Sequence, residues 1–305
     1  MNYTLNQLKI FLKIVENKNI TKAAEELHLT QPAVSIQLKN FQNQFDIPLT
    51  EVINKRIFIT DFGYEIAKAA ESILNETQNI DYKAGAYKGL LVGKLKISVV
   101  STAKYVVPFF LSDFIKHNPQ IDLVLDVTNK AKVIESLEAN EVDFSMVSKM
   151  PELPLNSIEL LQNKLFLVGA KNEFDKTKNT PKILQNIPLI YREEGSATRR
   201  AMEQYLERNE IKANKKLVLT SNEAVKQAVI SGLGYSIMPL IGIKNELLNQ
   251  ELAIIPITNL PITTAWNLVW LKEKNLSPVA SAFIKYIEAN KARIVDEKFK
   301  WFERF

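Results

Sequence analysis

Two short segments of the chain combine hydroxyl and cationic side chains in a way that suits a small anion. Each segment follows an apolar run, LKISVV or IPLIY, and precedes a stretch with helical spacing. The residues concerned are Ser101, Thr102 and Lys104 in the first segment and Arg192, Ser196, Thr198 and Arg199 in the second. A helix N-terminus carries partial positive charge, and hydroxyl and cationic groups there add hydrogen bonds to an anion. Ser and Thr also cap their own helices, and the pattern alone favours neither interpretation.

The residue types that catalysis or metal binding requires are scarce. The chain has no cysteine, which excludes disulfides, thiol redox sensing, cysteine nucleophiles and thiolate metal sites. The two histidines, His28 and His117, lie far apart in the sequence, and no GxxxxGK(S/T) phosphate-binding loop occurs. We therefore predict that the chain is not an enzyme and uses neither a cofactor nor a metal.

The first sixty residues have the spacing of three short helices. Apolar periodicity predicts them over residues 5–16, 22–27 and 31–45. Each follows a residue that can cap a helix, namely Thr4 (with Gln7 in a capping box), Asn19 or Thr21, and Thr30. A three-residue turn between the last two helices is typical of a helix-turn-helix, whose second helix fits the major groove of DNA. An ordinary three-helix bundle accounts for the pattern about equally well.

The third helix separates an apolar stripe from a second side that is free to meet DNA. At 100° per residue the stripe consists of Val34, Leu38, Phe41 and Phe45. The opposite side carries Pro32, Ser35, Ile36, Lys39 and Asn43. After this helix, residues 57–60 resemble the return strand of a wing, and Lys55 and Arg56 lie where phosphates would be contacted.

A long helix is expected from about residue 60 to residue 87. Steps of four and three residues along it form a heptad seam of Ile66, Ala70, Ile73, Thr77, Ile80 and Ala84. Such a seam favours pairing with an identical helix, which would place two DNA-binding heads on one duplex. Packing of this helix against its own domain is the alternative.

Beyond Gly89 the pattern changes to alternating strands and helices. Strands are expected at 95–101, 121–127 and 142–148, with helices at 105–117 and 133–140. A second series starts near 165, with strands at 187–191, 216–221 and 235–239 and helices at 199–208 and 223–230. The run 264–272 is expected to cross back to the first series, followed by a helix over 279–291. Two such lobes leave a cleft at the carboxyl ends of their strands, where ligands usually bind.

Composition limits the size, location and partners of the protein. At 305 residues and 46% hydrophobic content the chain can form two or three compact units, and no apolar run approaches ~18 residues. No signal-peptide pattern occurs near residue 1, so we expect a cytoplasmic protein without a membrane partner. The net charge is +5, but residues 1–60 contribute only +2 from seven basic and five acidic side chains, so charge alone does not indicate DNA binding.

The string TKAAEELHLTQPAVSIQLKNFQNQF, together with IPL at 47–49 and ITDFG at 59–63, resembles the DNA-binding signature of the LysR family of transcriptional regulators. The resemblance implies that Gln31, Pro32, Ser35 and Ile36 approach DNA bases and backbone. With the flanking residues, the predicted DNA-binding set is Thr30, Gln31, Pro32, Ser35, Ile36, Lys39, Lys55 and Arg56. The family usually continues with an aromatic residue, an acidic residue and an arginine after position 49. Thr50, Glu51 and Val52 stand there instead, and Lys55 and Arg56 are expected to compensate for the missing arginine.

The remaining chain also resembles LysR regulators, and within them the CbbR group, which controls carbon-fixation operons. The strings VVSTAKYVVP, TNKAKVIESLEANEVDFSMVSKMPE, REEGSATRRAMEQYL and SNEAVKQAVISGLG carry this resemblance. Members of that group respond to phosphorylated sugars, related carboxylates or nucleotide cofactors. The resemblance assigns effector binding to Ser101, Thr102, Lys104, Asn129, Lys130, Arg192, Ser196, Thr198 and Arg199. The acidic pair Glu193-Glu194 departs from the more usual proline-containing loop.

These observations predict an α-helical winged helix-turn-helix at 1–60, a linker and dimerisation helix at 61–89, and an α/β effector domain at 90–305. The effector domain is expected to have the two lobes of a periplasmic binding protein, about 90–164 with 268–305, and about 165–267. Expected partners are double-stranded DNA, a small anionic metabolite, further copies of the chain as a dimer of dimers, and RNA polymerase. The alternatives are a solute-binding module without a DNA function and, less favoured, an enzyme that converts a metabolite with Lys104 or Arg199 as a catalytic cation.

Overall fold

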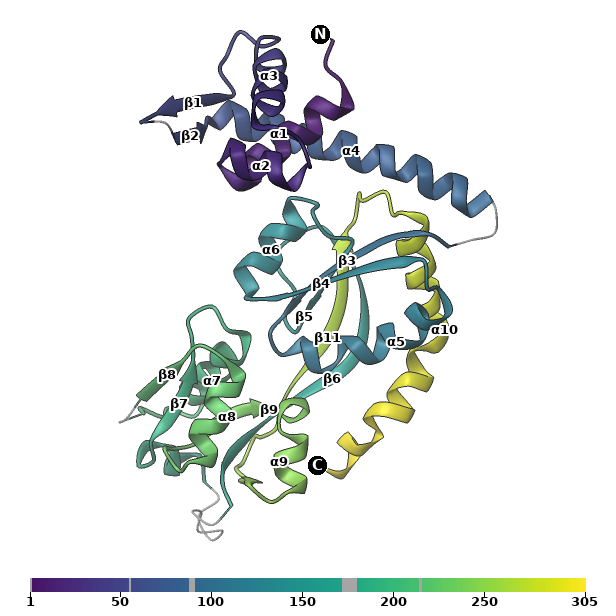
Figure 1. Cartoon of the computed structure of the whole chain (residues 1–305). Coiled ribbons are helices and arrows are strands. Elements are labelled where there is room, and N and C mark those ends of the chain that lie inside the picture. The colour runs from purple at the N-terminus through teal and green to yellow at the C-terminus, as the bar shows by residue number, and fades with distance from the viewer. Residues whose placement is uncertain (1, 55, 88–90, 172–179, 214–215) are drawn as a thin grey trace. The chain divides into compact units, whose positions relative to one another are not determined.

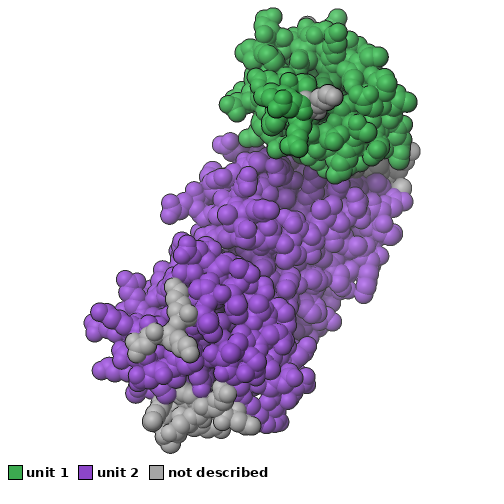
Figure 2. All heavy atoms as spheres, turned by 60° about the vertical axis from the view of Figure 1, so that its left-hand side comes forward, with its two compact units in different colours: residues 1–90 green, residues 91–305 purple. Residues whose placement is uncertain are grey.

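The computed structural model describes residues 2–54, 56–87, 91–171, 180–213 and 216–305. The chain divides into two compact units, Met1–Leu90 and Leu91–Phe305, which have different colours in Figure 2. Each unit has its own buried hydrophobic residues. Among the described residues, no helix combines the length and the apolar content that crossing a membrane requires.

Unit 1 begins with three short helices, α1 (Leu5–Asn17), α2 (Ile20–Glu26) and α3 (Gln31–Gln42), which are labelled in Figure 1. The predicted caps are present. Thr4 and Gln7 make both hydrogen bonds of a capping box, and the side chains of Asn19 and Thr30 accept from backbone N–H groups three residues later. Because Asn19 rather than Thr21 is the cap, α2 begins two residues earlier than predicted.

The third helix ends at Gln42, three residues before its predicted end. The N–H groups of Gln44 and Phe45 donate to carbonyl groups only three residues earlier, so the helical pattern tightens and stops. Phe45 still packs on the core, with its ring 5.2 Å from the ring of Phe41. The side-chain oxygen of Gln42 accepts from the N–H and the hydroxyl of Thr50, at 3.1 and 2.8 Å. These bonds tie the end of α3 to the strand that follows.

That strand, β1 (Thr50–Ile53), pairs with β2 (Arg56–Ile59) to form an antiparallel wing. The return strand was predicted, but β1 was not. The β1 residues are those that depart from the LysR pattern, and Thr50 is buried there through its bonds to Gln42. At the turn, Asn54 has a left-handed φ of 50°, which asparagine adopts more readily than most residues. Lys55 lies outside the described residues.

The long helix α4 (Asp61–Tyr87) follows the wing, as predicted. The heptad-seam prediction needs correction at its start, because Ala70 is buried in the core of unit 1 and Ile66 packs against that core. Farther along the helix, Ile73 is 39% exposed and Ile80 is 67% exposed. Only the later part of the seam, with Ile73 and Ile80, therefore presents exposed apolar side chains with which a second helix could pair. The side chain of Ala84 lies outside the described residues.

Unit 2 is built on a mixed seven-stranded sheet with the order β10-β6-β11-β5-β3-β4, and β9 also pairs with β6. These strands are β3 (Gly93–Val100), β4 (Ile121–Thr128), β5 (Phe144–Val147), β6 (Leu155–Ala170), β9 (Ser236–Pro239), β10 (Leu252–Ile254) and β11 (Ile262–Leu271). The central strand β3 is parallel to β4 and β5, and β11 is antiparallel to β5 and β6. A separate parallel pair consists of β7 (Leu189–Arg192) and β8 (Lys216–Leu219).

Two long strands connect the two ends of this sheet. Strand β6 has 16 residues, and its later part pairs with β9 and β10. Strand β11 returns beside β6 and reaches β5, as the sequence predicted. The sequence missed the first ten residues of β6. The predicted lobe limits at 164/165 and 267/268 fall inside these two strands, and a bulge between Trp266 and Asn267 interrupts their pairing.

Helices cover the sheet at both ends (Figure 1). They are α5 (Val107–His117), α6 (Lys130–Glu138), α7 (Ala197–Arg208), α8 (Asn222–Ile230), α9 (Lys244–Leu248) and α10 (Pro278–Phe299). Short 3-10 turns occupy Ala103–Tyr105, Pro181–Gln185, Leu240–Gly242 and Lys300–Arg304. The last helix runs eight residues beyond its predicted end at 291, because Ile294 and Phe299 are buried in the core.

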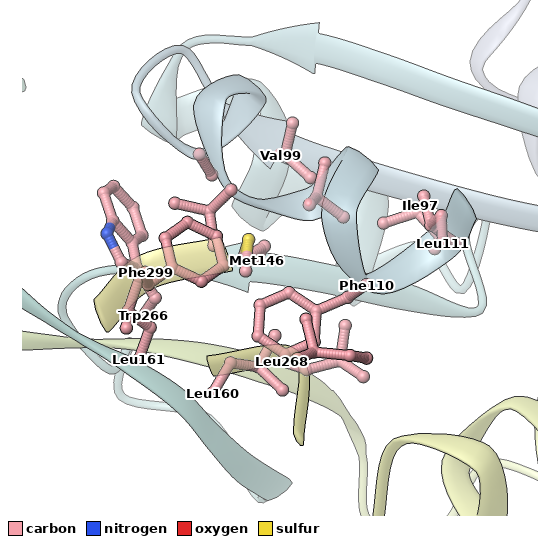
Figure 3. Close-up of a cluster of buried hydrophobic side chains, with 14 of the residues drawn as sticks. Ile97, Val99, Phe110, Leu111, Met146, Leu160, Leu161, Trp266, Leu268 and Phe299 are labelled. Atoms are coloured by element: carbon pink, nitrogen blue, oxygen red, sulfur yellow. The ribbon is translucent and has the colours of Figure 1, made fainter. Parts of the chain in front are cut away.

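The largest core of unit 2 lies between the sheet and helices α5 and α10. Figure 3 shows part of it, where Phe110, Met146, Trp266 and Phe299 lie close together. The rings of Phe110 and Phe299 are stacked with centroids 6.0 Å apart. The C-terminal segment therefore belongs to this core, because Phe299 and Phe302 are buried in it.

Candidate functional site

A cavity of about 210 Å³ lies in unit 2 at the carboxyl ends of β3, β4 and β7. Its walls are the loop after β3, the start of α6, and the loop that connects β7 to α7. The lining residues are Val100, Ser101, Thr102, Thr128, Asn129, Lys130, Ala131, Arg192, Glu193, Glu194, Gly195, Ser196, Ala197 and Thr198. This is the position that the alternating strands and helices predict for a ligand.

Seven of the nine predicted effector-binding residues line this cavity. They are Ser101, Thr102, Asn129, Lys130, Arg192, Ser196 and Thr198. The first two follow β3, the next two begin α6, and the last three lie between the end of β7 and the first turn of α7. Segments that are almost a hundred residues apart in the sequence thus face one cavity.

The other two predicted residues, Lys104 and Arg199, do not line it. The 3-10 turn at 103–105 leaves Lys104 exposed, with its ammonium group 5.1 Å from the ring centroid of Tyr105. Arg199 donates to Glu203 at 2.7 Å and to the carbonyl oxygen of Arg192 at 3.3 Å. The bond to Glu203 raises the pKa of Arg199. Arg199 therefore bonds to the backbone at the start of the loop between β7 and α7 and does not line the cavity.

The helix N-termini at the cavity are partly occupied by their own caps. The side chain of Asn129 accepts from the N–H of Lys132 at 3.0 Å, and Ser196 accepts from the N–H of Arg199 at 3.5 Å. Capping, one of the two interpretations that the sequence left open, therefore holds for these two residues. Thr102 makes no such side-chain bond to its 3-10 turn, so its hydroxyl can be directed to a ligand.

Arg192 is a buried and extensively hydrogen-bonded charged group of the cavity. Its side chain is 5% exposed, and every nitrogen of its guanidinium group has a partner. It donates to Ser101 at 3.2 Å, to Asn222 at 2.6 Å, and twice to Glu193, at 2.7 Å each. The bond to Ser101 joins the end of β7 to the end of β3 across the cavity.

Lys130 supplies a second cation, which is half-buried. Burial lowers the pKa of Lys130, and the positive charges of Arg200 and Lys149 lower it further. Three cations therefore lie near one another, and of these Lys130 lines the cavity. An anion placed there would relieve their mutual repulsion.

Two residues that matter for this geometry were not predicted. Asn222, at the start of α8, is buried and holds Arg192, and Thr128 lines the cavity at the end of β4. Asn222 follows the carboxyl end of β8, so its position relative to a strand end was the available signal. Glu193 was noted only as a departure from the family loop, but the structure places it on Arg192.

A second group of predicted residues lies on α3 in unit 1. Gln31, Pro32 and Lys39 are exposed, and Ile36 is 58% exposed, whereas the predicted stripe of Val34, Leu38 and Phe41 is buried. This division is the one that the spacing predicted.

Two of the polar residues on that surface are linked to each other. The amide nitrogen of Gln31 donates to the hydroxyl of Ser35 at 2.9 Å, one helical turn later. The bond limits the conformations of both side chains before any partner arrives. Thr30, the cap of this helix, is also exposed, and so is Arg56 at the start of the second wing strand.

Within the described residues, no group of three or more histidine, cysteine or acidic side chains is arranged to hold a metal ion. The hydroxyl groups and the two cations that line the cavity, Arg192 and Lys130, are hydrogen-bond donors that suit the binding of an anion.

Two family models match the chain. Residues 5–64 match the model described as bacterial regulatory helix-turn-helix protein, lysR family, and residues 88–292 match the LysR substrate binding domain. Together they match about two thirds of unit 1 and most of unit 2. The first match includes α1 to α3 and the wing, and the second includes the whole lining of the cavity.

Individual relatives agree with these matches. The chain is 35% identical to the HTH-type transcriptional activator CmpR of Synechocystis sp. over 95% of its own length and 96% of the relative's. It is 33% identical to the HTH-type transcriptional regulator CbbR of Rhodospirillum rubrum, over 93% and 96%. A solved structure of the Synechocystis CcmR regulatory domain in complex with 2-PG is 33% identical, with a TM-score of 0.62, over 65% of this chain and 97% of that one.

Proposed function

This chain belongs to the LysR family of DNA-binding transcriptional regulators, and from that premise we propose which residues read its operator and which bind its effector. Its relatives are regulators rather than enzymes. Unit 1 contains the helix-turn-helix, and the cavity of unit 2 lies within the effector-binding domain. We assign operator binding to residues 1–60, pairing of subunits to 61–89, and effector binding to the two lobes of 90–305.

For DNA, the proposal rests on the exposed side of α3. Gln31 and Ser35 would hydrogen-bond base edges, and Ile36 would meet a thymine methyl group in the major groove. A good bidentate contact with a base contributes about 1–3 kcal/mol of discrimination. Thr30, Pro32 and Lys39 would approach the backbone, and Lys55 and Arg56 would contact phosphates from the wing.

We predict that Arg56→Ala weakens binding to all DNA sequences by a similar factor, about tenfold, because a phosphate contact carries no sequence information. The slope of log affinity against log salt should fall by about one. Fluorescence anisotropy with operator and scrambled duplexes at two salt concentrations measures both quantities. A change in base preference with unaltered nonspecific affinity would contradict the role.

For the effector, the proposal rests on one observation, a buried arginine that joins the ends of β7 and β3 inside a cavity lined by hydroxyl groups and helix N-termini. We propose a small anionic metabolite as the ligand. CcmR, a relative that is 33% identical over its regulatory domain, has been solved with 2-PG bound. A compound that carries a phosphate or carboxylate group fits the donors of this cavity equally well.

We further propose a cytoplasmic homo-oligomer, in which the later part of the α4 seam pairs two chains and two such pairs form a tetramer. Binding of the effector would change how the DNA-binding heads are presented, and with it contacts to RNA polymerase. This coupling requires the effector to bind one assembly state more tightly than another, and about 1–3 kcal/mol suffices. Calorimetry that gives equal effector affinity with and without operator DNA would exclude it.

The deciding experiment for the function is an anisotropy titration of the full chain against the DNA upstream of its own gene. Specific binding should exceed binding to random DNA by about a thousandfold or more. The titration is repeated with 2-PG, inorganic phosphate and sulfate, and one of them should shift the curve. Binding no better than to random DNA under every condition would contradict the operator assignment.

A further inference from the structure

The cavity already contains an anion of its own, the carboxylate of Glu193. Both of its oxygens accept from Arg192, Oε2 from Nε and Oε1 from Nη2, at 2.7 Å each. This is the parallel, two-pronged geometry with which arginine binds a carboxylate or a phosphate. The Glu193 side chain is 27% exposed, so the pair lies at the wall of the cavity and can be reached from it.

A ligand that uses Arg192 meets a group whose best donors are already engaged. The remaining nitrogen, Nη1, is held by Asn222 at 2.6 Å in a buried position. Nη2 also donates to Ser101 at 3.2 Å. An effector that binds Arg192 through the two-pronged geometry needs the Nε and Nη2 hydrogens that point at Glu193. A bound anion and the Glu193 carboxylate cannot both occupy that pair of donors.

We propose that Glu193 is an internal competitor, whose carboxylate holds the Arg192 fork in the free protein and leaves it when the effector anion binds. The inference rests on the proposed binding of an anionic effector in this cavity. The Glu193 carboxylate is tethered to the chain, so it competes equally with every anion that uses Arg192. The affinity of each such anion is reduced by one factor, which is the inverse of the fraction of protein in which Glu193 has left Arg192. Only anions with strong additional contacts would then bind at low concentration.

The loop can release the side chain without unfolding. Glu193 precedes a turn in which its carbonyl oxygen accepts from the N–H of Ser196 at 3.3 Å. Gly195 sits in that turn with a left-handed φ of 82°, and no atom lies within 4 Å of the position a Cβ would take there. The side chain of Glu193 can rotate toward solvent while these backbone bonds stay in place.

The neighbouring Glu194 offers a matched control. It also lines the cavity and carries the same charge, but its side chain is 90% exposed and its ion pair is with Arg199 at 3.5 Å. If only the removal of a negative charge mattered, substitutions at both positions would change anion affinity alike. Direct competition for Arg192 predicts a change for the substitution of Glu193 alone.

The test compares the wild type with Glu193→Gln and Glu194→Gln, using calorimetric titration with inorganic phosphate and, separately, with sulfate. We expect E193Q to bind both anions about tenfold more tightly and by the same factor, and E194Q to change by less than about twofold. Arg192→Met is then combined with E193Q. The gain from E193Q should fall to about that of E194Q in that background, because the contested donors are gone and only the removal of one negative charge remains.

Reduced anion affinity in E193Q would overturn the proposal, since it would mean that Glu193 orients Arg192 for the ligand. Equal gains in E193Q and E194Q would overturn it as well, as would a gain from E193Q that is undiminished without Arg192. Operator binding, measured on the same samples by anisotropy, separates these results from failure of the regulator assignment. No anion binding in any variant, with normal operator affinity, would reject both the competitor and the anionic effector.

Discussion

Replacing Gly63 with alanine is expected to destabilise unit 1 by about 3 kcal/mol or more and to abolish specific operator binding. A Cβ at this position would lie 2.2 Å from the carbonyl oxygen of Leu49 and 2.9 Å from a side-chain carbon of Ile59. The same Leu49 oxygen accepts from the N–H and the hydroxyl of Thr60. The backbone around Leu49 and Thr60 cannot move away from the new Cβ without losing these hydrogen bonds. The loss of folding free energy should therefore match or exceed that of a typical overpacking substitution.

The substitution would affect DNA binding by displacing the wing, because Gly63 is not among the predicted DNA-binding residues. Gly63 lies in the first turn of α4, where its N–H donates to Thr60 at 2.9 Å, next to the wing. Displacing α4 would also displace β2 and the Arg56 that begins it. Chemical denaturation measures the loss of stability, and fluorescence anisotropy measures the loss of operator binding.

Ala69→Gly, on an exposed face of the same helix, is the matched control for Gly63→Ala. It should cost only about 1 kcal/mol, from helix propensity. If Gly63→Ala proves no more costly than this control, the close approach of α4 to Leu49 is refuted.

The second large effect is expected from Arg192→Met, which should lower effector affinity by more than about a hundredfold. Two charge-assisted hydrogen bonds to the ligand are lost, each of which contributes about 1.5–3 kcal/mol. The substitution also leaves Glu193 and Asn222 without their shared partner, so the unoccupied cavity becomes more negative. Titration with 2-PG, phosphate and sulfate measures the loss.

Arg208→Met serves as the control for this substitution. Arg208 is exposed at the last turn of α7 and does not line the cavity. Its substitution by methionine removes the same charge as Arg192→Met. Its effector affinity should stay within about twofold of the wild type. Thermal unfolding of both variants shows whether the fold is intact, and a folded Arg192→Met with wild-type anion affinity would contradict the role of Arg192.

Local signals in the sequence were sufficient for the helix caps and the buried stripe of unit 1, but not for strand β1 or the end of α3. The capping residues Thr4 and Thr30 and the stripe of Val34, Leu38 and Phe41 act within one or two helical turns, so spacing alone predicted them. The end of α3 was misplaced because it depends on Gln42, which bonds to Thr50 eight residues later. A long-range bond of this kind leaves no periodic pattern.

The same distinction applies to the cavity. Hydroxyl and cationic residues after strand ends were identifiable, because the ends of parallel strands converge. The pairing of Arg192 with Asn222, which is 30 residues away, depends on how β7 and β8 are aligned. Lys104 does not line the cavity, because the 3-10 turn at 103–105 directs its side chain toward the ring of Tyr105, and the sequence shows no sign of that turn.

The order of strands in unit 2 has a consequence for synthesis of the protein. The aromatic residues Phe110, Phe114 and Phe144 have all been made when β5 emerges, but they pack on Trp270, Phe283 and Phe299, which come more than a hundred residues later. At about 5–20 residues per second, the nascent chain carries these uncovered rings for roughly 8–30 seconds. The N-terminal end of the sheet therefore cannot complete its core until the ribosome has delivered α10, and in that interval it offers chaperones an apolar surface that the finished protein hides.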